Sequence, residues 1–270
     1  MNSVEIIGFG ASIMIGISLG LIGGGGSILT LPVMVYLLHI SPVISTAYSL
    51  FVVGTTSLVG SVSFMRKRLV NYKAALVFAI PSFTTVFLTR KFLVPAIPDP
   101  LFSLSGFEVS KNVGIMVFFA FIMLAASYSM IKSNKAKKED PNTELKFNYL
   151  MIALEGGLVG VLTGIVGAGG GFLIIPALVL FARLPMKMAV GTSLLIIAAK
   201  SLIGFLGDLS NLSVDWAFLL PFTGLSILGI FAGSYISKFI LGEKLKKAFG
   251  WFVLVMGIYI ITKEVFFHAA

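Results

Sequence analysis

One lysine lies inside a long apolar segment, where burial of a charged side chain is energetically costly. Lys200 lies about twelve residues from the preceding loop and about eight from the following one, too deep for its ammonium group to reach a membrane surface easily. A cation at such a depth is costly and typical of a functional site, and it favours a bound anion. The other partner open to it is a carboxylate within the chain, with Glu155 and Asp208 as the candidates. The sequence therefore predicts either an anion-binding lysine or a structural ion pair.

Small and polar residues recur around this lysine with the spacing of one helical face. Positions i, i+4, i+7, i+11 and i+14 are Ser193, Ile197, Lys200, Gly204 and Gly207. An earlier apolar segment has the matching stripe of Ser49, Val53, Thr56, Gly60 and Ser63. Tyr48 and Thr192 stand beside the two serines, with hydroxyls for a ligand or for another helix. We expect both stripes to face the interior of a helical bundle.

Two glycine clusters each precede a short apolar stretch. The first consists of Gly23, Gly24, Gly25 and Gly26, followed by Ser27, and the second of Gly167, Ala168, Gly169, Gly170 and Gly171. Glycine lets the backbone turn tightly and approach a ligand closely, and the helix N-terminus that follows suits an anion. The alternative is that these glycines only allow helices to pack closely. Neither cluster has the spacing of a nucleotide-binding loop.

The elements that must position these residues are membrane helices. Hydrophobic residues make up 57% of the 270 residues and charged residues 11%, and the mean hydropathy is +1.03. A helix that spans a bilayer takes about 20 apolar residues, so the chain has no room for a sizeable soluble domain. Ten apolar stretches follow one another: about 4–22, 28–38, 43–65, 72–97, 113–131, 149–166, 172–181, 188–206, 214–240 and 249–261. Residues 28–38 and 172–181 are too short to cross alone and read as broken helices.

The composition also excludes several kinds of site. The chain has no Cys, which excludes thiolate metal sites and cysteine nucleophiles, and its two His, His39 and His268, leave very little for a histidine-based metal or catalytic site; we expect no cofactor. The net charge of +9 is carried mostly by loops beside apolar stretches, which indicates orientation in a bilayer and not a nucleic-acid partner. Arg90 and Lys91 are expected to snorkel from a helix end to the surface. Glu155 is a candidate for proton coupling.

The two halves of the chain repeat. A shift of 144 positions aligns residues 20–72 with 164–216 without a gap, and 13 of these 53 positions are identical. Shared Gly, Pro and Ser residues are less easily explained by apolar composition than shared Leu or Val. The aligned pairs include Gly26 with Gly170, Pro32 with Pro176, Ser49 with Ser193 and Ser57 with Ser201.

Equivalent loops of the two halves have opposite charge. Residues 65–73 carry four Lys and Arg residues, whereas the equivalent 209–215 carry none, and lysines lie in 242–247 but not in 98–110. Because positive loops stay in the cytoplasm, the second half is expected to be inverted. We predict an all-α membrane protein with two inverted-topology repeats of about five segments each, at 1–132 and 148–270. The polar linker 133–147 is predicted to be cytoplasmic and both termini external, in a multi-pass protein of the cell inner membrane.

Two pairs of motifs point to a known family. They are the glycine-rich segments GLIGGGGSILTLP and GIVGAGGGFLIIPAL, and the Ser-Leu pairs that follow them in AYSL and AVGTSL. They resemble the TauE/SafE family of membrane transporters, also called the 4-toluene sulfonate uptake permease family, over nearly the whole chain. The resemblance implies movement of sulfur oxyanions such as sulfite, sulfoacetate and other organosulfonates.

Together these features predict a secondary transporter that moves a small anion across the lipid bilayer by alternating access. The predicted substrate contacts are the two glycine clusters with Ser27, and Ser49, Thr56, Thr192, Ser193 and Lys200. One alternative is an uncoupled anion channel. A less favoured one is an intramembrane enzyme with a Ser193–Lys200 dyad, although about 10 Å of helix separates these two residues.

Overall fold

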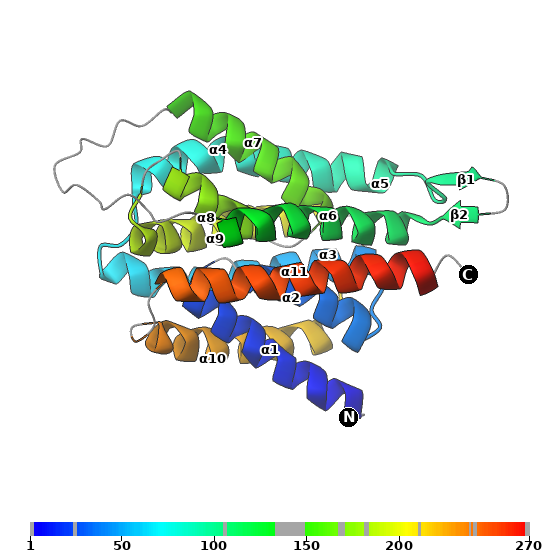
Figure 1. The fold of residues 1–270 in the computed structure, drawn as a ribbon, viewed down its shortest axis with the longest axis horizontal. Coiled ribbons are helices and arrows are strands. Elements are labelled where there is room, and N and C mark those ends of the chain that lie inside the picture. Colours follow the sequence, from blue (N-terminus) through cyan, green and yellow to red (C-terminus); the bar gives the residue numbers. More distant parts are fainter. Residues whose placement is uncertain are drawn as a thin grey trace.

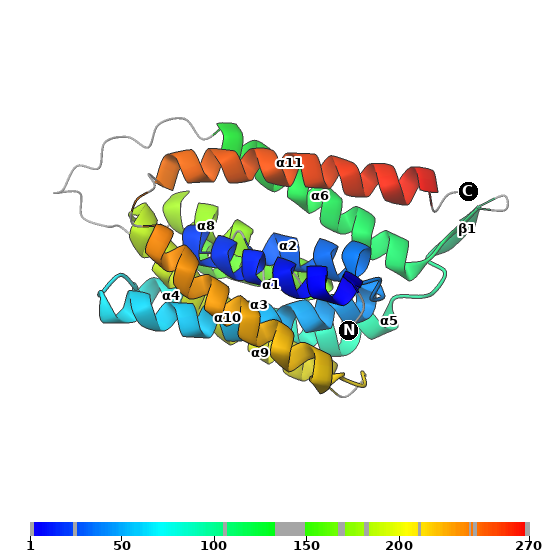
Figure 2. The ribbon, with the colours of Figure 1, turned by 90° about the horizontal axis from the view of Figure 1, so that it is seen from below.

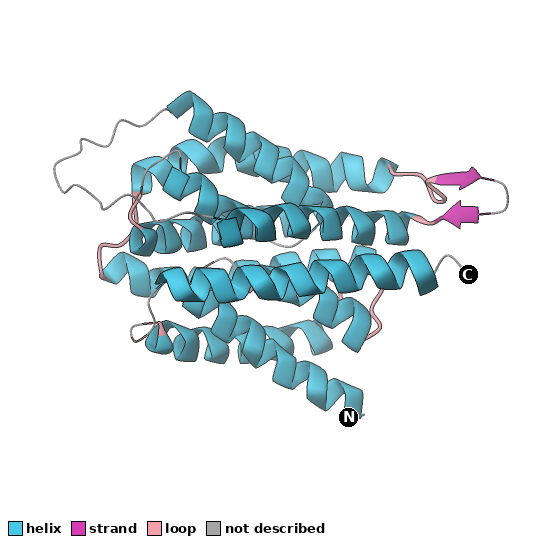
Figure 3. Ribbon diagram, viewed as in Figure 1, coloured by secondary structure: helices cyan, strands magenta, loops and turns pink. Residues whose placement is uncertain are grey.

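The computed structural model describes residues 3–23, 26–104, 107–132, 149–166, 171–180, 184–209, 212–237, 239 and 242–267. Nearly all of them are helical (Figures 1 and 3). The helices are α1 (Ser3–Ile22), α2 (Ser27–Pro32), α3 (Pro42–Arg66), α4 (Tyr72–Leu88), α5 (Val94–Ala96), α6 (Lys111–Lys132), α7 (Tyr149–Val166), α8 (Gly171–Leu180), α9 (Met186–Asp208), α10 (Trp216–Ile236) and α11 (Gly242–Phe267). Two π-helical turns, η1 (Val33–Leu37) and η2 (Thr89–Leu93), continue α2 and α4.

Helix starts follow local sequence signals. Pro42 begins α3, where its fixed φ angle suits a first turn and its missing N–H costs nothing. The side chain of Asn71 caps α4 by accepting a hydrogen bond from the Ala74 N–H, and Asp215 caps α10 in the same way through the Phe218 N–H. Each of the ten apolar stretches of the sequence has a helix or a helix with its π-helical continuation.

The antiparallel helices α3 and α9, called the central pair below, are the most buried of the bundle, and α10 passes in front of them in Figure 2. Of their membrane-length spans 67% and 72% are buried, compared with 39% for α4, α6 and α10. The outer helices pack in pairs: α1 against α10, α4 against α7, and α6 against α11. Figure 1 shows that α6 and α11 run in opposite directions, and that α1 and α7 start at opposite ends of the molecule.

Glycines bring the paired outer helices into backbone contact. A Cβ atom added to Gly16 of α1 would meet the backbone of Ser226 of α10, and one added to Gly160 of α7 would lie 2.6 Å from the Ser82 carbonyl oxygen of α4. A shift of 144 positions relates Gly16 to Gly160 and Ser82 to Ser226. Small residues at a helix contact are typical of membrane proteins, where close packing replaces the hydrophobic effect.

The outer surface of the bundle is apolar. Five helices of the described chain are long and apolar enough to cross a bilayer, and three further apolar helices are shorter. Their outward side chains include Leu76 and Ile80 on α4 and Leu154 and Leu158 on α7, each about 60% exposed. Such a belt of exposed apolar side chains needs lipid as its solvent. The chain is therefore an all-α, multi-pass membrane protein.

One element was not predicted from the sequence. Strands β1 (Phe102–Leu104) and β2 (Phe107–Val109) form an antiparallel hairpin between α5 and α6, with Phe102 paired to Val109 and Leu104 to Phe107. The hairpin extends beyond the helices at one end of the bundle (Figure 3). Three-residue strands give too short an alternation to stand out in a chain of this apolar content.

Candidate functional site

Lys200 lies near the midpoint of the central helix pair. The rings of Phe51 and Phe205 contact each other with their centroids 5.1 Å apart, and a Cβ atom on Gly54 would lie 3.0 Å from Leu202 Cγ. This antiparallel register brings Lys200 of α9 level with Thr56 of α3. The lysine predicted from its position in the sequence is thus fully buried, well inside both helices of this pair.

The ammonium group of Lys200 is buried with a neutral partner. Its side chain is 0% exposed, and Nζ donates a hydrogen bond of 2.9 Å to Thr163 Oγ1 of α7. Thr163 in turn donates to the Val159 carbonyl oxygen at 2.7 Å. Within the described residues, no carboxylate lies within ion-pair distance of Lys200. A buried charge without a counter-ion is expensive, so this arrangement suits a site whose counter-ion is a ligand.

Neither carboxylate considered as an internal partner fills that role. Asp208 pairs with Arg90, with its Oδ2 atom 3.5 Å from Nε. Glu155 is half-buried on α7, and its Oε2 atom has no hydrogen-bond partner in the described part of the chain. The structural ion pair that the sequence left open for Lys200 is therefore not formed.

Hydroxyl groups without partners line the two central helices. Ser49 and Thr56, both predicted site residues on α3, are fully buried, and neither hydroxyl has a hydrogen-bond partner among the described residues. Ser57 and Ser201, which follow Thr56 and Lys200 in the sequence, are also fully buried without a hydrogen-bond partner among the described residues. These two serines were not predicted as site residues. Their signal was present in the sequence, because they form an identical pair in the aligned repeats. A buried hydroxyl normally finds a partner, so four such groups on the central pair mark it as a candidate site.

Other predicted hydroxyls already have partners. Ser193 donates to the Val190 carbonyl oxygen of its own helix at 2.9 Å. Thr192 accepts a hydrogen bond of 2.9 Å from the Asn71 N–H, and Tyr48 accepts one of 2.7 Å from the Asp215 N–H. Tyr48 and Thr192 thus bond between helices, which was one of the two roles open to them.

The described glycines serve both a turn and close packing. Gly23 follows α1 with φ at +78°, a conformation that favours glycine, and a Cβ atom there would lie 2.5 Å from Val190 Cγ1 of α9. Gly26 precedes α2, and its added Cβ would lie 2.6 Å from the Ile15 carbonyl oxygen. Ser27 and Gly171 are the first residues of α2 and α8. The remaining predicted glycine-cluster residues lie outside the described residues: Gly24, Gly25, Gly167, Ala168, Gly169 and Gly170.

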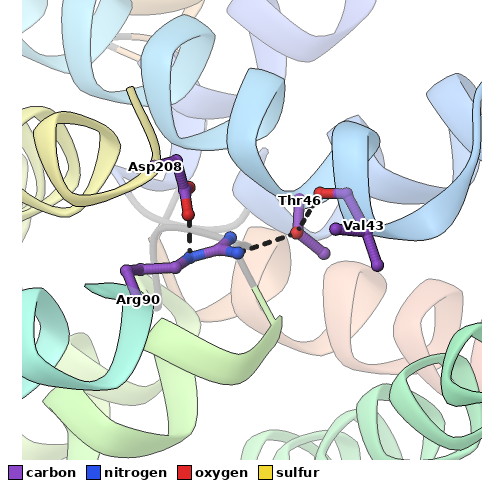
Figure 4. A network of polar contacts seen from close by, with 4 residues as sticks. All are labelled: Val43, Thr46, Arg90 and Asp208. Carbon is purple, nitrogen blue, oxygen red and sulfur yellow. Dashed lines mark hydrogen bonds and ion pairs between the residues drawn. The ribbon is translucent and has the colours of Figure 1, made fainter. Parts of the chain in front are cut away.

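The prediction that Arg90 snorkels to the membrane surface was wrong. Arg90 is 0% exposed and lies between α3 and α9, where its Nη1 atom donates a hydrogen bond of 2.9 Å to Thr46 Oγ1 beside the Asp208 pair (Figure 4). Gly207 makes room for it, because a Cβ atom there would lie 3.1 Å from Arg90 Cβ. An acidic partner on a neighbouring helix offsets the cost of burial, and sequence spacing does not reveal that partner. The neighbouring Lys91 is exposed.

The chain is similar to a protein family and to individual proteins that are named as exporters or membrane transporters. The family described as Sulfite exporter TauE/SafE matches residues 8–260. A probable membrane transporter protein of Xylella fastidiosa (strain 9a5c) is 28% identical over 269 residues, covering 96% of this chain and 95% of that protein. The probable membrane transporter protein YunE of Bacillus subtilis (strain 168) is 29% identical over 219 residues, covering 74% and 76% of the two chains. No solved structure matches the chain significantly.

The family match spans almost all of the membrane helices, including both glycine-rich segments and the central pair α3 and α9. In the described part of the chain, His, Asp and Glu side chains form no group of three that could hold a metal ion. Because the family model matches residues 8–260 and the relatives are named as membrane transporters, the chain belongs to the Sulfite exporter TauE/SafE family and is a membrane transporter, not an enzyme.

Proposed function

We propose that this protein is a secondary transporter of a small anion, a sulfur oxyanion such as sulfite, sulfoacetate or another organosulfonate, in the cell inner membrane. The observation that carries the proposal is Lys200, a fully buried ammonium group whose hydrogen-bond partner is the neutral Thr163. An anion that binds beside it supplies the charge that its surroundings lack. A bound anion would also offset the energetic cost of burying the Lys200 charge within the membrane.

The chemistry around Lys200 suits an oxyanion. A sulfite or sulfonate group presents several oxygens that accept hydrogen bonds, and charge-assisted bonds to an ammonium group are the strongest of these. The buried hydroxyls of Thr56, Ser57 and Ser201 are donors without partners in the described residues, at or beside the level of Lys200. The family description names sulfite, which agrees with this donor set.

The proposed mechanism is alternating access between two inverted repeats, 1–132 and 148–270, joined by a cytoplasmic linker at 133–147. Two hydrogen bonds support this symmetry. The Asn71 N–H of the first half bonds to Thr192 of the second, and the Asp215 N–H of the second half bonds to Tyr48 of the first. The same shift of 144 positions relates Asn71 to Asp215 and Tyr48 to Thr192. Such reciprocal contacts are expected of two halves related by a pseudo-two-fold axis.

The symmetry would put that axis at the solute site. The equivalent residues Thr56 and Lys200 lie level with each other in the antiparallel pair, so the axis passes close to both. In inverted-repeat transporters the solute binds at the repeat interface near the bilayer midplane. Movement of one half against the other would then expose one fixed site to each side in turn. We assign Gly23, with its positive φ angle, and Gly26, which precedes α2, a supporting role in placing α2 beside α3.

The test is anion binding and transport by the purified protein. We expect sulfite or sulfoacetate to raise the melting temperature, because binding to the folded state stabilises it by mass action, with smaller effects of acetate and phosphate. Proteoliposomes should accumulate the same ³⁵S-labelled anion against its gradient when an ion gradient is imposed. Lys200→Met should shift both responses to anion concentrations about ten- to a hundredfold higher, whereas Lys187→Met, at an exposed position of the same helix, should shift neither. A protein that responds to none of these anions would contradict the proposal.

A further inference from the structure

Arg90 has more hydrogen-bond donors than its surroundings use. Nη1 donates to Thr46, but Nε and Nη2 have no hydrogen-bond acceptor among the described residues, although the whole side chain is buried. The Asp208 Oδ2 atom lies 3.5 Å from Nε, longer than a good hydrogen bond. The two groups therefore form an ion pair without a hydrogen bond, and the second terminal nitrogen of the guanidinium is unoccupied.

The place of this pair in the fold connects it to Lys200. Arg90 is on the π-helical turn η2, Asp208 is the last residue of α9, and Thr46 is near the start of α3. The three meet at one end of the α3–α9 pair (Figure 4), which is the outer end in the proposed topology. π-Helical turns within longer helices are frequent at functional sites.

A polar stripe on α3 leads from Arg90 to the level of Lys200. Thr46, Ser49 and Thr56 are separated by three and seven residues and therefore share one face of the helix. The hydroxyls of Ser49 and Thr56 are both buried without partners in the described chain. These hydroxyls thus lie on one buried face of α3, between the end that carries the Arg90 contact and the level of Lys200.

We propose that Arg90 is a second anion-binding residue, at the outer end of the α3–α9 pair, and that Asp208 neutralises it until a solute oxyanion takes its place. The inference rests on the proposed transport of an anion. A guanidinium binds an oxyanion through two parallel hydrogen bonds, which suit the unoccupied Nη2 and the loosely held Nε. Asp208 then competes with the solute for Arg90, so that the outer site holds an anion briefly and passes it on.

The test separates this role from a purely structural ion pair. The variant Arg90→Gln with Asp208→Asn removes both charges together and leaves no unpaired buried charge, so it should fold and melt near the wild type. We expect its half-saturation concentration for ³⁵S-sulfite or ³⁵S-sulfoacetate uptake to rise about tenfold or more in right-side-out vesicles. In inside-out vesicles, where the solute reaches Lys200 from the other side, the change should be under threefold. Lys91→Gln, a charge removal at the exposed neighbour, is the control.

Asp208→Asn alone gives a second measurement. It removes the competitor of the solute and leaves Arg90 buried without its partner. The purified variant should melt at a lower temperature than the wild type when empty, and sulfite should raise its melting temperature by more than it raises that of the wild type.

The outcomes distinguish the two proposals. An unchanged half-saturation of the double variant at both faces, or no larger response of Asp208→Asn to sulfite, would make the pair structural and overturn the second site alone. If wild-type vesicles take up neither anion, the proposed function fails, and the Arg90 site fails with it.

Discussion

Lys200→Met is the substitution that the structure makes most informative. Methionine keeps an unbranched side chain of similar length and removes the charge. Because the ammonium is bonded to Thr163 and no carboxylate of the described residues pairs with it, the change strands no opposite charge. Thr163 keeps its bond to the Val159 carbonyl oxygen. The loss is one charge-assisted hydrogen bond, about 1.5–3 kcal/mol, and the gain is relief of a buried charge that costs at least ~2.5 kcal/mol.

These two terms nearly cancel, so the empty variant should melt within a few degrees of the wild type or above it. Its affinity for the anion should change much more. Loss of a desolvated charge-assisted hydrogen bond weakens binding by about 1.5–3 kcal/mol, which is about ten- to a hundredfold in the dissociation constant. Both quantities are measured on one preparation, the melting temperature without ligand and the dissociation constant for sulfite by calorimetry.

The opposite pattern would refute the reasoning. If Lys200 instead holds a carboxylate of the chain, its removal strands a buried charge and should destabilise the empty protein by about 3–5 kcal/mol. A large drop in melting temperature with unchanged affinity would therefore remove Lys200 from the site. Lys187→Met reports how much any Lys-to-Met change on α9 alters detergent stability.

Two further predictions concern the turns and the topology. Gly23→Ala should lower stability by about 1–2 kcal/mol, measured by thermal unfolding, because φ is +78° and the new Cβ would meet Val190. Gly224→Ala, in the middle of α10 with nothing within 4 Å of its added Cβ, should instead raise stability by about 0.5–1 kcal/mol, and an equal loss in both variants would contradict the assigned turn. In a chain without native Cys, Lys67→Cys should be shielded from an impermeant thiol reagent in intact cells and the equivalent Asn211→Cys should be labelled. Labelling of both from one side would exclude inverted repeats.

The sequence could predict the features that depend on local pattern. Helix positions follow from apolar runs bounded by Pro, Asn or Asp, and α7 has the bounds that the apolar stretch predicted. Lys200 was recognisable because a charge in the middle of an apolar run is visible without knowledge of its neighbours. That Lys200 has no carboxylate partner among the described residues could not be predicted. The sequence offers Glu155 and Asp208 equally as partners, and only the packing shows that neither pairs with it.

Arg90 shows what local pattern cannot reveal. It lies next to Lys91 near the end of an apolar run, and both looked like surface charges. The structure buries one and exposes the other, because the π-helical turn η2 and the close approach at Gly207 direct them differently. The partner of Arg90 lies in the other half of the chain, and a pairing between such distant residues depends on the three-dimensional packing of η2 against α9.

The proposed symmetry of the halves would account for one lysine, and not two, at the proposed solute site. Thr56 and Lys200 are equivalent positions at the same level, so a second lysine would bring two like charges together where the dielectric is low. If the pseudo-two-fold axis passes between these positions, the lysine should work at either one. The double variant Thr56→Lys with Lys200→Thr should then restore part of the sulfite affinity that Lys200→Thr alone removes. Restoration should be incomplete, because the position equivalent to Thr163 is the buried Leu19, which offers no hydroxyl. Adding Leu19→Thr should then raise the affinity further, measured by calorimetry. If the exchanged variant binds no better than Lys200→Thr, the two positions are not equivalent, and the axis does not pass through the site.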